Sequence, residues 1–106
     1  RHSGLTRYNG GWASMFRSMK MRLETTLGVR GIEHIGSTAI PGMVARPTID
    51  MLLYVDSIDD ALTFSKKLEP LGWKTDDLSD NPYRTFSKYH MDTPVYRLYV
   101  VPNGMD

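Results

Sequence analysis

The sequence EHIGSTAIPGMVARPTIDMLLYV, residues 33–55, decides the fold that we expect for this chain. It begins with a short apolar strand pattern that runs into a Gly-Ser-Thr turn at 36–38, and Pro-Gly at 41–42 marks a second turn. A second strand pattern follows over 48–55, and a single carboxylate, Asp50, interrupts it. A Gly-Ser turn beside an acidic residue on a neighbouring strand is an arrangement that can hold phosphate groups and a metal ion.

The composition indicates one ordinary globular domain. The chain has 106 residues, enough to bury roughly two-thirds of the unfolded surface. It is 41% hydrophobic and 24% charged, and its net charge of +1 argues against nucleic-acid binding through bulk electrostatics, although a local basic groove is compatible with it. The absence of cysteine excludes a disulfide framework and thiolate metal sites, and fits a reducing cytoplasm. No apolar run approaches the roughly 18 residues of a membrane span.

Helix and strand patterns are both present along the chain, which predicts an α+β fold. Apolar residues recur at helical spacing over 12–27, and Gly28 is a stop signal. A capping-box pattern opens a second helix at Ser57, and Pro70 ends it near residue 69. The nearly continuous apolar pattern of 48–55 is typical of a strand covered on both faces. We expect helices packed against one sheet, with strands over 32–35, 48–55, 73–75, 84–89 and 95–101.

The Gly-Ser-Thr turn is a candidate anion site. Backbone amides at Gly36, Ser37 and Thr38 can converge on a phosphate, because glycine permits the turn and the hydroxyls add donors. Arg46, nine residues after Ser37, would neutralise the bound charge. The alternative is a turn from strand to helix that Ser37 or Thr38 merely caps.

Asp50 is the candidate metal ligand and catalytic residue. A carboxylate within an apolar strand costs several kcal/mol unless a metal, a cation or hydrogen bonds compensate it. The structural alternative is an internal ion pair with Arg46, Arg84 or Arg97. Magnesium transfer sites normally use more than one acid, but Leu52 is the next residue on the same strand face.

The remaining polar candidates have ordinary structural interpretations. Asp92 lies before the last strand and is a weak candidate for a second acid. His34 and His90 are isolated and are interpreted as strand or loop histidines. A group of basic and aromatic residues forms either a rim for a nucleobase or an exposed strand face: Tyr83, Arg84 and Lys88.

Residues 32–42 and 45–50 resemble the GrpB family, which is assigned to the nucleotidyltransferase superfamily. The family's usual sequence over these residues is close to that of this chain, with Lys at the position of Arg46. Tyr8, Trp12 and Phe16 resemble the family's opening helix. The resemblance runs from about Leu5 to the end of the chain, with later matches at Leu68, 71–72 and 100–102.

The resemblance implies a nucleotidyltransferase-like mixed sheet with a Gly-Ser motif after one strand and an acid on the next. It implies that Gly36 and Ser37 hold nucleotide phosphates and that Asp50 holds Mg²⁺, so that transfer depends on positioning and charge neutralisation. The chain departs from the superfamily pattern where Leu52 replaces the second acid. It departs from the family where Arg97-Leu98-Tyr99 replaces a common His-x-His.

From the resemblance we expect a single GrpB-like domain over 5–106 without the family's C-terminal helices, and we expect 1–4 to be a remnant of cloning. The leading hypothesis is binding of a nucleotide or another phosphate-bearing small molecule, with Mg²⁺-dependent nucleotidyl transfer if the chain is an enzyme. The alternative is an inert binding or interaction domain in which Asp50 forms a structural ion pair. We expect a cytoplasmic protein with no membrane or nucleic-acid partner, and self-association is compatible with a shortened domain.

Overall fold

The computed structural model describes residues 10–42, 46–75 and 82–104. The segment 1–4, predicted to be a remnant of cloning, therefore lies outside the described residues. In chain order the structure has helix α1 (Gly11–Leu27), strand β1 (Glu33–Ile35), the 3₁₀ helix η1 (Ser37–Ala39), strand β2 (Ile49–Val55), helix α2 (Asp60–Leu68), the 3₁₀ helix η2 (Glu69–Leu71), and strands β3 (Trp73–Thr75), β4 (Arg84–His90) and β5 (Thr93–Pro102).

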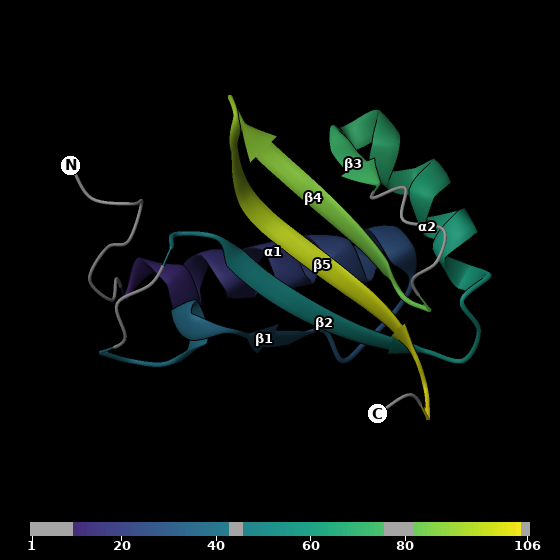
Figure 1. The fold of residues 1–106 in the computed structure, drawn as a ribbon, viewed down its shortest axis with the longest axis horizontal. Helices are drawn as coiled ribbons and strands as arrows, with labels where there is room; N and C mark the ends of the chain where they lie inside the picture. The colour runs from purple at the N-terminus through teal and green to yellow at the C-terminus, as the bar shows by residue number, and fades with distance from the viewer. Residues whose placement is uncertain (1–9, 43–45, 76–81, 105–106) are drawn as a thin grey trace.

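The strands form one mixed sheet in the order β1-β2-β5-β4-β3. The central pair, β2 and β5, is parallel, and the other three pairs are antiparallel. Helix α1 lies across one face of this sheet, and the other face is turned toward the viewer in Figure 1. The predicted α+β class, with a mixed sheet and helices packed against it, is confirmed.

The hydrophobic core fills the space between the two helices and one face of the sheet. The predicted stripe of α1 is confirmed, because Trp12, Met19, Leu23 and Leu27 are all buried. Helix α2 contributes a second buried stripe. The core residues from α2 and the sheet are Ala61, Phe64, Leu68, Ile49, Met51, Leu53, Val55, Trp73, Phe86, Leu98 and Val100.

Strand β2 is packed on one face only, so the prediction of a strand covered on both faces was wrong. Burial alternates strictly along it, and Asp50, Leu52 and Tyr54 lie on the face away from the helices. The apolar pattern misled because Leu52 and Tyr54 are apolar without being covered by a helix. We call this surface the open face; in register, it carries Asp50 and Leu52 on β2 opposite Arg97 and Tyr99 on β5.

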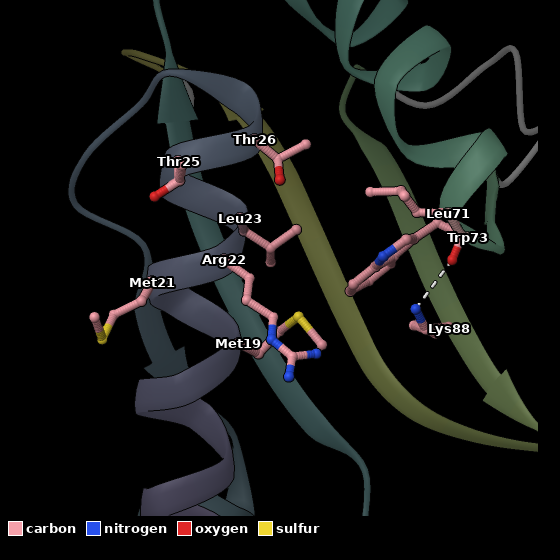
Figure 2. Close-up of a pocket in the computed structure, with 9 residues that line it drawn as sticks. All are labelled: Met19, Met21, Arg22, Leu23, Thr25, Thr26, Leu71, Trp73 and Lys88. Atoms are coloured by element: carbon pink, nitrogen blue, oxygen red, sulfur yellow. Dashed lines mark hydrogen bonds between the residues drawn. The ribbon is translucent and has the colours of Figure 1, made fainter.

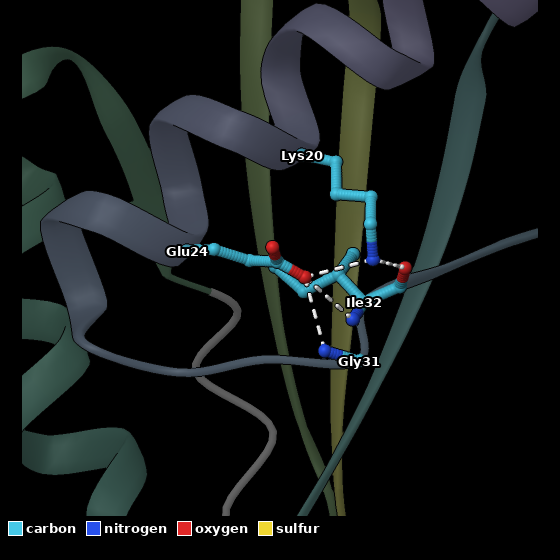
Figure 3. Close-up of polar contacts among 4 residues, drawn as sticks. All are labelled: Lys20, Glu24, Gly31 and Ile32. Carbon is cyan, nitrogen blue, oxygen red and sulfur yellow. Dashed lines mark hydrogen bonds and ion pairs between the residues drawn. The ribbon is translucent and has the colours of Figure 1, made fainter.

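A polar cluster ties the end of α1 to the start of β1 (Figure 3). The ammonium of Lys20 donates to Glu24 Oε2 at 2.7 Å and to the carbonyl of Ile32 at 2.7 Å. The same carboxylate oxygen accepts from the N–H groups of Gly31 and Ile32, at 3.0 and 3.2 Å. The hydrogen bond from Lys20 holds the pKa of Glu24 below its usual value. The cluster fixes where β1 begins, and β1 leads directly into the Gly-Ser turn.

No helix among the described residues is both long and apolar enough to cross a membrane.

Candidate functional site

The Gly-Ser turn begins beside Asp50 on the neighbouring strand. Ile35 pairs with Asp50 across β1 and β2, so Gly36 leaves the sheet beside that carboxylate. Gly36 has a φ of +77°, and a Cβ atom placed on it would lie 3.0 Å from Asp50 Oδ2. A side chain at position 36 would therefore be strained both by the backbone angle and by the carboxylate.

The turn continues into η1, a single turn of 3₁₀ helix in which no side chain among the described residues caps the first residues. Its first hydrogen bonds run from the N–H of Ala39 to the carbonyl of Gly36, at 3.1 Å, and from Ile40 to Ser37, at 3.2 Å. The N–H groups of Ser37 and Thr38 precede these bonds and have no partner within η1. They are the backbone donors that the sequence predicted for a phosphate.

The side chain of Thr38 has a structural role. It is 1% exposed, and its hydroxyl donates to the carbonyl of Thr48 at 3.3 Å. His34 Nε2 lies 3.0 Å from Thr38 Oγ1. Because the Thr38 hydroxyl proton is already donated to Thr48, His34 Nε2–H is the donor of this second hydrogen bond. Thr48 in turn donates to the carbonyl of Pro94 at 2.8 Å. Only the backbone of Thr38 is therefore available to a ligand. Its hydroxyl ties η1 to Thr48, the residue before β2, and the hydroxyl of Thr48 ties that residue to β5.

His34 is a partly buried strand histidine with a hydrogen-bond partner, as the sequence interpretation held. Its ring stacks on Phe16 of α1, with 4.7 Å between the ring centroids. Burial lowers the pKa of His34. The ring therefore stays neutral near neutral pH and links the helix layer to the Gly-Ser turn.

Asp50 carries an incompletely compensated charge. Burial raises the pKa of the Asp50 carboxyl, and the nearby positive charge of Arg97 offsets this only in part. Arg97 is its register partner on β5, but among the described residues no ion pair joins the two side chains. Of the other predicted partners, Arg84 lines a pocket beside α2, on the helix side of the sheet. A carboxylate that burial disfavours on balance is a candidate for a functional role.

Arg97 is held in place on the open face. Its Nε donates to Ser87 Oγ at 3.1 Å, and Ser87 is only 4% exposed. Burial opposes the charge of Arg97, but Tyr99 and Asp50 outweigh burial and raise its pKa. Sequence reasoning missed Ser87. The signal was present, because Thr85 and Ser87 stand on either side of Phe86 on β4, which places both hydroxyls on the sheet face opposite Phe86.

The residues of two further predictions about the site do not lie together in the structure. Arg46 is exposed and lines a pocket of about 330 Å³ with Asp92, between the start of β2 and the start of β5. The lining of that pocket does not include the Gly-Ser turn. The sequence left two interpretations of Tyr83, Arg84 and Lys88, a nucleobase rim or an exposed strand face. The three do not lie on one face: Lys88 lies over the ring of Trp73 on the helix side, whereas the ring of Tyr83 lies near that of Tyr99. Side chains of a strand alternate between faces, which divides the group.

The described residues contain no group of three acidic, histidine or cysteine side chains that would hold a metal ion by themselves. Among the described residues, the register partners of Asp50 on the open face are Ile35 on β1 and Arg97 on β5, and the exposed Glu33 lies opposite Leu52 on the same face. A magnesium centre held by this part of the chain alone therefore does not fit. One carboxylate is sufficient only where bound phosphates supply further oxygen ligands.

The sequence profile described as GrpB protein matches residues 3–106. The chain belongs to the GrpB family. Among curated relatives, UPF0157 protein YqkA of Bacillus subtilis is 43% identical over 68 residues, which is 62% of this chain and 20% of the relative. Glutamate-rich protein GrpB of Alkalihalophilus pseudofirmus is 38% identical over 72 residues, 65% of this chain and 41% of the relative. The matches thus span less than half the length of these relatives.

Solved structures with the same fold include the conserved protein GrpB from Enterococcus faecalis. It superposes with a TM-score of 0.85 at 23% identity, covering 94% of this chain and 62% of that one. A cytoplasmic RNA terminal U-transferase gives 0.62 at 16% identity over 92% of this chain and 33% of its own. The Cid1 poly(U) polymerase gives 0.63 at 14% identity, over 92% and 34%. These likenesses confirm the nucleotidyltransferase-like fold.

Replacing Gly36 by Ala should cost about 1–3 kcal/mol of unfolding free energy, since the new Cβ is strained at positive φ and approaches the Asp50 carboxylate. Gly36→Ala in an Asp50→Ala chain is the control, because the backbone angles at position 36 (φ +77°, ψ −173°) stay the same while the carboxylate is removed. Urea unfolding should show a larger loss for Gly36→Ala in the parent chain than in the Asp50→Ala chain. Equal losses would mean that the Asp50 carboxylate does not constrain position 36.

Asp50→Asn should leave the domain at least as stable as the parent at neutral pH. The folded state binds the Asp50 proton more tightly than the unfolded chain does, so stability falls as the pH rises from 3.8 through the raised pKa. The benefit of Asn should therefore disappear as the pH falls below that window. Thermal unfolding over a pH series measures this, with the exposed Asp92→Asn as control. A lower melting temperature for Asp50→Asn at neutral pH would contradict it.

Proposed function

We propose that this chain binds a nucleotide, or a chemically similar phosphate-bearing small molecule, on the open face of its sheet. The observation that carries the proposal is the close approach of Gly36 to Asp50, which leaves no room for a side chain: a Cβ atom placed on Gly36 would lie 3.0 Å from Asp50 Oδ2. It brings two backbone donors at the start of η1 beside a carboxylate that lacks a full internal partner. Site geometry of this kind, rather than the fold, is the argument for the ligand.

A nucleotide supplies a partner for each exposed polar group of the site. Phosphate oxygens would accept from the N–H groups of Ser37 and Thr38 and from the guanidinium of Arg97. Hydroxyl or amino groups of the ribose or base would donate to Asp50. Arg46 is not part of the proposed site, because the pocket that it lines with Asp92 does not include the Gly-Ser turn.

Magnesium enters this proposal only together with the nucleotide. Asp50 is the residue that would hold a Mg²⁺ ion carried by the phosphates, and such an ion would neutralise phosphate charge. The solved Cid1 poly(U) polymerase structure with MgGTP bound supports a nucleotide ligand for this fold. We limit the proposal to binding, because Leu52 stands at the position of the superfamily's second acid and nucleotidyl transfer lacks that group here. The cysteine-free sequence supports a cytoplasmic setting.

The competing interpretation is an inert domain in which Asp50 and Arg97 form a structural pair. Their direct register on β2 and β5 favours it, while the net rise in the pKa of Asp50 argues against it. The two interpretations differ for variants. If the pair is structural, Asp50→Asn destabilises the domain, and Arg97→Leu in the same chain restores stability.

Thermal unfolding with ATP, GTP, CTP and UTP, each with and without Mg²⁺, tests the proposal. At least one nucleotide should raise the melting temperature by several degrees, because a ligand at a hundred times its Kd adds about 2.7 kcal/mol to the stability of the folded state. Arg97→Leu should weaken the apparent affinity for the nucleotide about tenfold, since it removes a charged partner of the phosphate. The rise in melting temperature at a given nucleotide concentration should therefore be smaller.

Arg30→Leu is the matched control for that variant, because Arg30 is exposed in the loop between α1 and β1. It should retain the full nucleotide response. If no nucleotide shifts the melting temperature at millimolar concentration, with or without Mg²⁺, the proposed function is wrong. If Arg97→Leu and Arg30→Leu respond equally, binding occurs somewhere other than the open face.

A further inference from the structure

A second hollow lies on the helix side of the sheet, between α1 and the edge formed by η2, β3 and β4 (Figure 2). Its volume is about 560 Å³, within the range of small-molecule sites. We call it the α1–β3 pocket. The residues that line it are Met19, Met21, Arg22, Leu23, Thr25, Thr26, Leu71, Trp73 and Lys88.

The floor of the α1–β3 pocket is apolar and fixed by the core. Met19 and Leu23 of α1 and Trp73 of β3 are all nearly fully buried, so their positions are set by packing. Leu71 is half exposed at the edge, which leaves an uncovered apolar surface next to the indole. An open apolar hollow with a rigid aromatic wall can gain contacts from a small apolar ligand.

The rim of the pocket is positively charged. Arg22 is an exposed side chain of α1, and Figure 2 shows it directed into the space between the helix and Trp73, whereas Met21 and Thr25 point away from it. On the other side Lys88 donates to the carbonyl of Leu71 at 3.0 Å and lies 5.9 Å from the centroid of the Trp73 ring. Two cations and no acid line the pocket, so its charge favours an anion.

We propose that the α1–β3 pocket binds a small amphiphilic carboxylate, with its apolar part on Met19, Leu23 and Trp73 and its carboxylate between Arg22 and Lys88. A guanidinium and an ammonium on opposite sides suit a carboxylate, which accepts from both. The site lies across the sheet from Asp50 and does not depend on the proposed nucleotide site. A second copy of the chain is the other candidate occupant, and the test separates the two.

NMR of the ¹⁵N-labelled chain, titrated with sodium decanoate below its micelle concentration, reads the pocket directly. The chain has two tryptophans, and only Trp73 lines the pocket. The indole N–H signal of Trp73 should shift in a saturable way, and that of Trp12 should not. Decanol, the neutral analogue, should shift the same signal with weaker affinity, because it lacks the charge that the rim selects.

Arg22→Glu should weaken decanoate binding by about tenfold or more, the effect of losing one charge-assisted contact, and should leave decanol binding unchanged. Arg17→Glu is the matched control, because Arg17 is exposed on the same helix and does not line the pocket. Thr26→Phe, which fills the hollow, should block both probes; a native-like spectrum for each variant confirms that it is folded.

Three results would overturn the proposal. One is a Trp73 signal that does not respond to decanoate. Another is an equal response to decanoate and decanol that Arg22→Glu leaves unchanged, which would make the hollow an unselective apolar surface. The third is a Trp73 signal that changes with protein concentration alone, together with dimers in light scattering, which would show that a second copy fills the pocket.

Discussion

The contact between Gly36 and Asp50 is the constraint on which the rest of the site depends. It exists because the antiparallel pairing of β1 and β2 sets Ile35 opposite Asp50, and because a residue without a side chain follows Ile35. A one-residue shift in this register would turn Asp50 toward the core, where its charge would have no compensation. The polar cluster around Glu24 and the hydrogen bonds of Thr38 fix the register from both ends of β1.

The two faces of the sheet have different chemistry. The face under the helices is apolar, and pockets open at its edges between α1 and β3 and beside α2. The open face carries Asp50, Arg97 and small buried hydroxyls, and burial raises the pKa of Asp50, which disfavours its charged form. Proteins tolerate such a cost mainly where a ligand or a reaction uses the group. The parallel pairing of β2 and β5 brings Asp50 and Arg97 opposite each other.

Much of the fold follows from local patterns, because helix stripes, turn residues and strand alternation act over short distances. The positions of α1, β1, β3, β4 and β5 were predicted within a few residues. That the sheet would contain both parallel and antiparallel strands was expected from the resemblance to the GrpB family. The one-sided cover of β2 was not predictable, since apolar residues at Leu52 and Tyr54 look the same in the sequence whether or not a helix covers them.

The site was predictable in its centre and not at its margins. Gly36, Ser37 and Asp50 are joined by one strand pairing, which a short segment specifies. The roles of Thr38, Lys20 and Glu24 depend on which side chains meet across elements, and Lys20 and Glu24 showed only the i,i+4 spacing of an ordinary helix pair. Arg46 was placed by its distance along the chain, and that distance does not determine on which side of the loop it emerges.

The most direct test of the central claim is an NMR titration of the ¹⁵N-labelled chain with ATP in the absence of Mg²⁺. The titration is followed at the backbone amides and at the side-chain N–H signals of arginine and tryptophan. The account predicts saturable shifts at Gly36, Ser37 and Thr38 and at Arg97 Nε–H, with the Trp73 indole unchanged. Shifts confined to residues outside the open face, or no saturable shift at the Gly-Ser turn, would contradict it.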